Sequence, residues 1–332
     1  MQIARILGVC AMLVACPASA GAVSYSGLYV FGDSLVDSGN VYVKTGGALA
    51  SGADGYYGGR FSNGFNFADY LSIHFAGTPA TAALLGGSNF AVGGANAAYA
   101  PGEVSPSFLA QVAAFASGGT PITSDALVLV TFGGNDVRDT IGTGGTIDFT
   151  AAATDLALGL NQLYALGARN FVVTGAPDIG QLPVSIGTAG AIPGRLAELT
   201  DRSQQISTVL STQTTMLDSM QGANAQFFDL FAYQQALLAD PGSFGLPAGL
   251  NTTTPCQIVG GGEPQIANCD NALYFDAIHP TTQVHAAIAT AIIGQLNASA
   301  VPEAESWALL IMGFAGTGVV LRRQRFRAAA PA

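Results

Sequence analysis

The chain has 332 residues, of which 49% are hydrophobic and only 10% are charged. Its 11 basic and 21 acidic side chains give a formal net charge of −10. An acidic surface repels phosphate backbones and anionic lipid headgroups, so the composition argues against a nucleic-acid-binding protein. The apolar fraction is ample for a large core, and the length allows one α/β domain with terminal appendages.

Residues 1–20 have the three parts of a secretory signal peptide. Arg5 supplies the positive charge, a short apolar stretch follows, and Ala18-Ser19-Ala20 is a small-residue cleavage site. The apolar stretch is too short to span a bilayer. We therefore expect export and removal of this segment by signal peptidase. The string Leu13-Val14-Ala15-Cys16 leaves a second interpretation open, in which Cys16 carries a lipid.

Apolar runs that end in turn residues predict strands along the chain. In residues 29–40 (YVFGDSLVDSGN) such a run leads into a tight turn that presents Ser34. The run ALVLVTF is nearly continuous, which is typical of a central parallel strand buried on both faces. The predicted strands are 28–31, 88–92, 126–132, 171–174 and 226–230.

Amphipathic segments between these strands predict helices. A helix is expected to begin in GRFSNGFNFADYL, and another over 151–166 is closed by Gly167. A third has Pro280 in its first turn and reaches about residue 296. Further helices are predicted over 107–115 and 195–220. Alternating strands and helices predict an α/β fold, a parallel sheet with helices on both faces.

Two cysteines, Cys256 and Cys269, remain once residues 1–20 are removed. They lie 13 positions apart in a loop rich in Gly, Pro, Asn and Thr. In an oxidising compartment this pattern predicts a disulfide. A metal site would need more ligands nearby, so we expect no metal.

Groups suited to acyl transfer follow the predicted strands. Ser34, Gly93-Gly94 and Asn135 each come after a strand, and Asp276-Ala277-Ile278-His279 supplies a base and an acid near the end of the domain. Because the carboxyl ends of parallel strands share one edge of a sheet, these groups can meet. A serine hydroxyl needs a neighbouring base, and a carboxylate can fix the imidazole tautomer. Glycine N–H and an Asn amide can donate to an oxyanion.

The segments FGDSLVDSGN, NFAVGGANA, FGGND and FDAIHPT resemble the successive blocks of the SGNH (GDSL) esterase and lipase family. They occur in the family's order, and the match spans residues 28 to about 297. The resemblance implies a three-layer α/β/α domain of flavodoxin-like type with a five-stranded parallel sheet in the order 2-1-3-4-5. It also implies hydrolysis of carboxylic esters through an acyl-serine intermediate, without metal or organic cofactor.

Residue by residue, the resemblance implies that Ser34 is the nucleophile and His279 the base. Asp276, three residues earlier, would orient the imidazole. The other two candidate histidines of the mature chain, His74 and His285, lie inside predicted helices, and we expect them to be structural.

The same resemblance implies an oxyanion hole made of the Ser34 backbone N–H, Gly94 and Asn135. Whether Gly93 or Gly94 donates stays open, with Gly94 preferred for its distance from the preceding strand. Asp136 is expected to cap the following segment or to tie down the Asn135 loop.

Two alternative functions remain. One is removal of acetyl groups from a polysaccharide, so the expected partner is an acyl ester, a lipid or an acetylated glycan. The other is a surface-binding module that keeps the fold without catalysis, although the intact candidate triad argues against it. The glycine pairs do not indicate a nucleotide site, because no Gly-Lys-Ser/Thr follows them.

The C-terminal segment carries a separate signal. Pro302-Glu303-Ala304 precedes an apolar run that ends at Leu321, and four arginines follow within residues 322–327. The run of about 15 apolar residues is short for a membrane span, and the arginines mark a cytoplasmic end. This resembles the PEP-CTERM sorting signal of exopolysaccharide-producing Gram-negative bacteria, except that Ala304 replaces the usual second proline.

The sorting resemblance implies an exosortase-type enzyme as a partner, and a plain membrane tail is the alternative. The expected organisation is a signal peptide (1–20), a hydrolase domain (21–300) and a sorting tail (301–332). We therefore expect the protein in the periplasm, at the cell surface or in the extracellular matrix, anchored transiently in the membrane by its tail.

Overall fold

The computed structural model describes residues 23–258 and 265–299. The predicted signal peptide and sorting tail lie outside these residues. The elements belong to the compact unit Ser24–Gly294, apart from the end of the last helix. In chain order they are β1 (Leu28–Gly32), α1 (Asn40–Lys44), α2 (Phe67–Ala76), α3 (Phe108–Ser117), β2 (Leu127–Thr131), α4 (Gly134–Arg138), α5 (Thr150–Ala165), β3 (Asn170–Thr174), α6 (Pro183–Ala189), α7 (Arg195–Asp218), β4 (Asn224–Phe228), α8 (Leu230–Ala239), β5 (Gln257–Ile258), β6 (Gln265–Ile266) and α9 (Thr282–Ser299).

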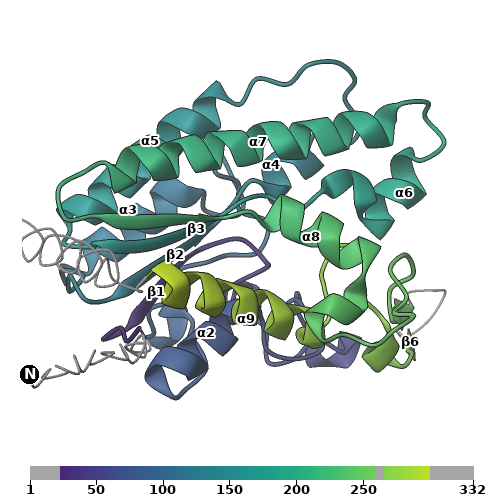
Figure 1. Cartoon of the computed structure of the whole chain (residues 1–332), viewed down its shortest axis with the longest axis horizontal. Coiled ribbons are helices and arrows are strands. Elements are labelled where there is room, and N and C mark those ends of the chain that lie inside the picture. The colour runs from purple at the N-terminus through teal and green to yellow at the C-terminus, as the bar shows by residue number, and fades with distance from the viewer. Residues whose placement is uncertain (1–22, 259–264, 300–332) are drawn as a thin grey trace, which may run out of the picture. The chain divides into compact units, whose positions relative to one another are not determined.

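The main sheet is parallel, with the strand order β1-β2-β3-β4. The register has no offset, so Gly32 pairs with Thr131 and Thr131 with Thr174. Helices α3, α5 and α7 cover one face of the sheet, and α2 and α9 lie on the other (Figure 1). The predicted three-layer α/β/α fold is therefore confirmed. Because all the strands end level with one another, the loops that follow them leave from a common edge.

The predicted count of five strands is wrong, because residues 88–92 do not form a strand. This segment runs parallel to β1 and touches it through an isolated bridge between Val30 and Asn89. The other edge of Asn89 is bonded to loops: its N–H donates to Thr81 O, and its carbonyl accepts from Ala83 N–H. The segment thus occupies the expected place beside β1 and is bonded to it, through Val30 N–H to Ser88 O, Phe90 N–H to Val30 O and Val92 N–H to Gly32 O, but this pairing amounts to an isolated bridge and not to a strand.

The core is centred on β2, as its apolar run predicts. All five of its residues are buried, because helices cover both faces of the sheet. On α7, buried Leu199, Ile206, Leu210 and Leu217 recur at helical spacing. Both elements therefore follow the periodicity of the sequence.

The start of the last helix differs from the prediction. It begins at Thr282, whereas Pro280 pairs with Tyr274 across a narrow loop. Within that loop the N–H of Phe275 donates to the carbonyl of His279 at 2.8 Å. The residues before α9 are therefore fixed by backbone pairing rather than by the helix.

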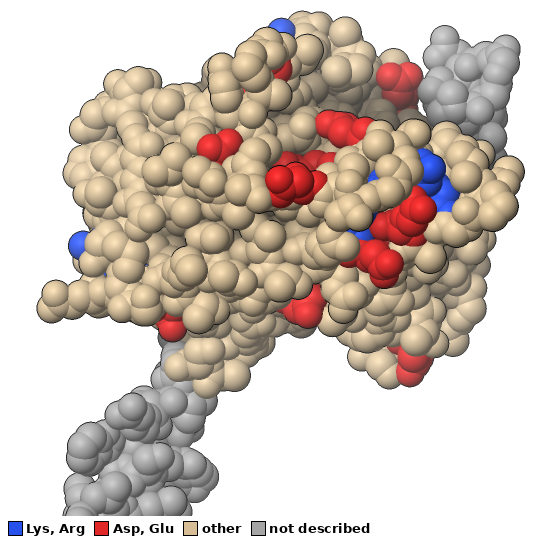
Figure 2. Space-filling model, turned by 90° about the horizontal axis from the view of Figure 1, so that it is seen from above, with Lys and Arg blue, Asp and Glu red and all other residues tan. Residues whose placement is uncertain are grey.

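Charged groups are sparse on the surface. Figure 2 shows one face of the molecule, on which uncharged side chains make up most of the area and acidic side chains lie in separate groups. Near the start of α7, Arg195 and Arg202 both pair with Glu198, at 3.1 and 3.5 Å. The visible face therefore matches the low charged fraction of the sequence.

The predicted pair Cys256–Cys269 forms a disulfide, with a Cα–Cα distance of 5.2 Å. Its half-cystines pack with Ala272 and Phe275, and the ring of Tyr56 lies against the same cluster. The bridge thus fastens the strand β5 to the segment that leads towards His279.

Replacing both cysteines with alanine should destabilise the fold by about 3 kcal/mol, because the bridge restricts the unfolded chain. Urea unfolding of the variant and the oxidised protein measures the difference. A thiol titration of the purified, unmodified protein is the control, and two free thiols there, or equal urea midpoints, would contradict the prediction.

Candidate active site

Ser34 lies in a tight turn directly after β1. The N–H of Leu35 donates to Oδ1 of Asp33 at 2.9 Å and closes this turn. A Cβ atom at Gly32 would lie 2.8 Å from the carbonyl oxygen of Thr131, so the close approach of the strands requires glycine there. Ser34 is thereby held at the carboxyl edge of the sheet, with 7% of its surface exposed.

Two side chains from the loop before α9 meet Ser34. Nε2 of His279 lies 2.7 Å from Oγ of Ser34, and Nδ1 lies 2.7 Å from Oδ2 of Asp276. With Nδ1–H donating to the carboxylate, Nε2 is left to accept the serine proton. The structure therefore brings together the three residues that the sequence assigns to a triad, although 245 positions separate Ser34 from His279.

The Asp276 carboxylate is held on both oxygens. Oδ1 accepts the N–H groups of Ile278 (2.8 Å) and His279 (2.7 Å). Burial by itself would raise the pKa of Asp276, but the interaction with His279 and the hydrogen bonds of these donors outweigh burial and lower the pKa to about 2. The carboxyl group is therefore ionised at neutral pH and can accept from the imidazole.

Tyr56 is a site residue that sequence reasoning missed. Its hydroxyl donates to Oδ2 of Asp276 at 2.8 Å, on the same oxygen that His279 contacts. Burial, together with the Asp276 charge, raises the pKa of Tyr56, so the phenol stays protonated and acts as a donor. Its ring packs edge-on against Phe275, and Phe61 lies against the His279 ring. In the sequence Tyr56 is only one aromatic of a glycine-rich loop, and no local pattern marks it.

Gly94, the predicted oxyanion donor, and Gly93, its alternative, differ in their hydrogen bonds. The N–H of Gly93 donates to Oδ2 of Asp37 at 2.9 Å. Gly94 has φ +82°, and its N–H has no acceptor among the described residues. The N–H of Ser34 likewise has none there. These contacts favour Gly94 over Gly93 as the donor.

Asn135 lies in the first turn of α4, directly after β2, and lines a small pocket together with Ser34. One amide hydrogen of Nδ2 is used by the carbonyl of Ala95, at 2.9 Å. The neighbouring Asp136 accepts the N–H groups of Ala97 and Ala98, which ties the 95–98 segment to α4. The second amide hydrogen of Asn135 can therefore serve a ligand beside Ser34.

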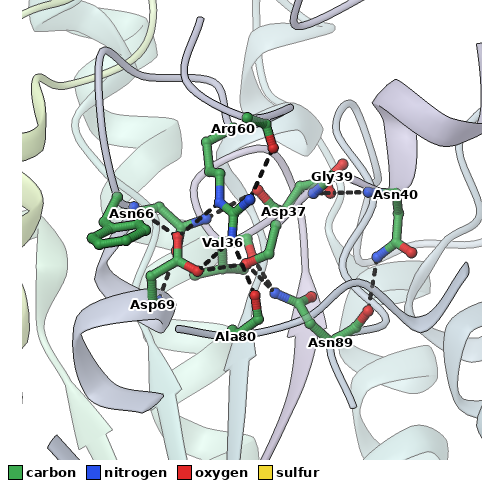
Figure 3. Close-up of polar contacts among 12 residues, drawn as sticks. Val36, Asp37, Gly39, Asn40, Arg60, Asn66, Asp69, Ala80 and Asn89 are labelled. Carbon is green, nitrogen blue, oxygen red and sulfur yellow. Dashed lines mark hydrogen bonds and ion pairs between the residues drawn. The ribbon is translucent and has the colours of Figure 1, made fainter. Parts of the chain in front are cut away.

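A buried polar network supports this edge of the sheet (Figure 3). The Asp37 carboxylate accepts N–H groups from Gly39, Asn40, Val41 and Gly93, at 2.6–3.1 Å. Burial raises the pKa of Asp37, and the four donors oppose that rise. Asp37 thereby joins the turn after β1 to Gly93, the residue directly before the candidate oxyanion donor Gly94.

The remaining histidines lie apart from this site. His285 is fully buried on α9 beside Phe67, and burial lowers its pKa to about 3, so it is neutral. His74 lies on α2, where its ring contacts Phe75. Within the described part of the chain, no group of three or more His, Cys, Asp or Glu side chains could hold a metal ion.

Comparisons with known proteins identify a family that covers most of the chain. The family model of the GDSL-like lipase/acylhydrolases matches residues 28–292. GDSL esterase/lipase LTL1 of Arabidopsis thaliana is 29% identical, over 80% of this chain and 86% of that protein. The phosphatidylcholine-sterol acyltransferase of Aeromonas hydrophila is 26% identical, over 85% and 93%. The secreted effector protein SseJ of Salmonella typhimurium is 27% identical, over 78% of this chain and 60% of that protein.

Proposed function

The chain belongs to the GDSL-like lipase/acylhydrolase family and is an ester-bond hydrolase, and we propose that it cleaves carboxylic esters through an acyl intermediate on Ser34. The observation that carries the proposal is the continuous hydrogen-bond chain from Asp276 through His279 to Ser34, with both side-chain distances at 2.7 Å. This arrangement activates a serine hydroxyl, which is a weak nucleophile by itself.

In the first step Ser34 Oγ attacks the ester carbonyl carbon while His279 Nε2 takes the hydroxyl proton. The resulting oxyanion accepts hydrogen bonds from the N–H groups of Ser34 and Gly94 and from Nδ2 of Asn135. The carbon–oxygen bond to the alcohol then breaks, and the alcohol leaves with the proton from His279. Asp276 remains ionised and stabilises the imidazolium.

In the second step a water molecule attacks the acyl-serine carbonyl and gives a proton to His279. The bond to Ser34 Oγ breaks, the carboxylic acid leaves, and the proton returns to the serine. No redox change occurs, and each step is a proton transfer coupled to acyl transfer.

Covalent labelling tests this proposal. Diisopropyl fluorophosphate should inactivate the enzyme and add one diisopropylphosphoryl group, which peptide mapping should locate on Ser34. A label on another residue that accompanies full inactivation would overturn the assignment, as would an active protein that resists the reagent and carries no label.

A substrate panel separates ester hydrolysis in general from the alternative of polysaccharide deacetylation. The panel contains p-nitrophenyl esters, a phospholipid and acetylated xylan. Activity confined to the acetylated glycan and to acetate esters would favour the deacetylase. The second alternative, a non-catalytic module, is set aside because the chain is a hydrolase.

Tyr56→Phe should lower kcat about five- to tenfold and leave KM within twofold, because one hydrogen bond to an ionised carboxylate is lost. The matched control is Tyr57→Phe, which changes the neighbouring tyrosine of the same loop. Equal kcat values for Tyr56→Phe and the unmodified enzyme would show that Tyr56 does not position Asp276. A parallel rise in KM and fall in Tm would instead indicate a purely structural role.

We propose that the enzyme acts outside the cytoplasm. Two observations support this: residues 1–20 resemble a signal peptide, and one relative is named as a secreted effector. Cleavage at the sorting tail would release it to the surface or matrix. Mass spectrometry of the mature protein tests both points. An N-terminus at Met1 would contradict export by a cleaved signal, and a C-terminus at Ala332 would favour a plain membrane tail.

A further inference from the structure

Arg138 brings a positive charge to the small pocket that contains Ser34. It is the last residue of α4, one turn after Asn135, and both side chains line this pocket. Residues three apart on a helix lie on the same face, so the guanidinium group is a neighbour of the candidate oxyanion donor. Arg138 is the only basic side chain among the described residues that line the pocket.

The Arg138 guanidinium differs from the other cations of the domain in its contacts. The other five basic side chains of the described residues each have a hydrogen-bond or ion-pair partner. They are Lys44, Arg60, Arg169, Arg195 and Arg202. The Arg138 side chain makes no hydrogen bond and no ion pair with any described residue. Its N–H donors are therefore available to a ligand that enters the pocket.

The acids closest to Arg138 in the chain are bonded elsewhere. Asp136 accepts two N–H groups from the 95–98 segment, and Asp139 accepts from Nδ2 of Asn96 at 3.0 Å. Side chains one or two positions apart on a helix do not face each other. Helix α4 thus directs these two acids to the 95–98 segment, whereas Arg138 lines the pocket.

Asp33 is the acid that lines the same pocket, but it is shielded. Only 3% of its surface is exposed, and its Oδ1 accepts the N–H of Leu35. Burial raises the pKa of Asp33 to about 6, and the charge of Arg138 is one of the influences that oppose this rise. The two groups thus lie within electrostatic reach, although no ion pair joins them. Because Arg138 is only half-buried, its charge is the more accessible of the two to a ligand.

We propose that Arg138 is a specificity-determining residue that binds a carboxylate group of the substrate; the inference rests on the proposed function. The enzyme then prefers esters whose acyl or alcohol part carries a carboxylate over neutral esters of the same size. The planar guanidinium can donate two parallel hydrogen bonds to a carboxylate. Side chains one helical turn apart are separated by about 5–6 Å at their Cβ atoms, so the carboxylate lies a few carbons from the reacting carbonyl group.

The rest of the pocket favours a carboxylate over other groups. Its apolar side chains, such as Ile179 and Leu182, offer no hydrogen bonds to a neutral polar group. A cationic group meets the like charge of Arg138. A doubly charged phosphate is repelled more strongly than a carboxylate by Asp33 and by the acidic surface around it.

The test compares kcat/KM within two pairs of esters that differ only in charge. The pair p-nitrophenyl monoadipate and p-nitrophenyl adipamate has the carboxylate or its neutral amide on the acyl side. The pair 4-acetoxybutanoate and 4-acetoxybutanamide has it on the alcohol side. At low ionic strength we expect one pair to favour the carboxylate about tenfold, and that pair identifies the part of the ester that carries the anion. Equal kcat/KM values within both pairs would overturn the proposal.

Arg138→Gln should lower this preference about tenfold, to nearly equal values within the pair. Arg138→Lys should retain part of the preference, because the charge remains while the planar group is lost. The matched control is Arg169→Gln, directly before β3 at the opposite edge of the sheet, which should keep the preference. If Arg138→Gln lowered kcat/KM equally for both members of each pair, a specificity role would be wrong.

Salt provides a second measurement, which covers the case in which Arg138→Gln does not fold. Attraction between Arg138 and a carboxylate weakens as salt screens the charges, so the preference of the unmodified enzyme should fall as salt is added. The net charge of the chain is −10, and its overall field repels anions. Screening of that field alone would favour the anionic ester instead. A preference that rises with salt would therefore contradict the role of Arg138.

The two proposals fail in different ways. If Ser34 is labelled and neutral esters are cleaved, but the charge of the ester has no effect, the assignment of Arg138 is wrong and the proposed function stands. If no ester is cleaved and Ser34 is not labelled, the proposed function fails, and the assignment of Arg138 falls with it.

Discussion

Ser34→Ala should lower kcat for ester hydrolysis by about 10⁴–10⁶ without changing the unfolding midpoint. The Ser34 hydroxyl lies 2.7 Å from His279 Nε2, and no other hydroxyl or thiol lines the small pocket that contains Ser34 and Asn135. His279→Ala should cause a loss of similar size, and the double variant should lose little more, because members of a triad act as a unit. Asp276→Asn should cost less, about 10²–10⁴, since the imidazole remains as base.

The matched control for this series is Ser117→Ala, a change at an exposed serine at the end of α3. It should keep full activity. The decisive measurement is single-turnover hydrolysis of a p-nitrophenyl ester by each purified variant. If Ser34→Ala keeps the turnover of the unmodified enzyme on every ester tested, the acyl-serine mechanism is wrong.

Arg60→Met should destabilise the fold by about 3–5 kcal/mol, the largest effect on stability that we expect from a single change. Arg60 Nη2 lies 2.8 Å from Oδ1 of Asp69, whose side chain is fully buried, and Nη2 also donates to the carbonyl of Ala80 (Figure 3). Removing the guanidinium leaves the Asp69 charge without its counter-ion. The effect is large because an unpaired charge in the protein interior is unfavourable, and this cost exceeds the loss of the contact itself.

Urea unfolding of three variants separates these contributions. The double variant Arg60→Met/Asp69→Asn should recover part of the loss, because no unpaired charge remains. Glu198→Gln is the control on the half-exposed ion pairs of α7 and should change stability by less than about 1 kcal/mol. A loss of less than about 1 kcal/mol in the free energy of unfolding for Arg60→Met would contradict this prediction. It would show that water or a local rearrangement stabilises the Asp69 charge in place of the guanidinium.

The sequence by itself determined the features that depend on neighbours along the chain. The apolar run of β2 predicts a strand buried on both faces, and the spacing of Leu199, Ile206, Leu210 and Leu217 predicts a helix with one buried face. The acid three residues before His279 predicts a pair that can meet across one turn. In each case a period or a short spacing fixes which side chains share a face, whatever the rest of the chain does.

The tertiary structure decided the features that join distant segments. Tyr56 and Asp276 are 220 positions apart, so no spacing could predict their hydrogen bond. The hydrogen bond from the Gly93 N–H to the Asp37 carboxylate joins residues 56 positions apart. Residues 88–92 read as a strand, yet their backbone hydrogen bonds to β1 amount to an isolated bridge. Such contacts depend on how whole elements pack, and side-chain packing and hydrogen bonding between segments are not encoded in any local pattern.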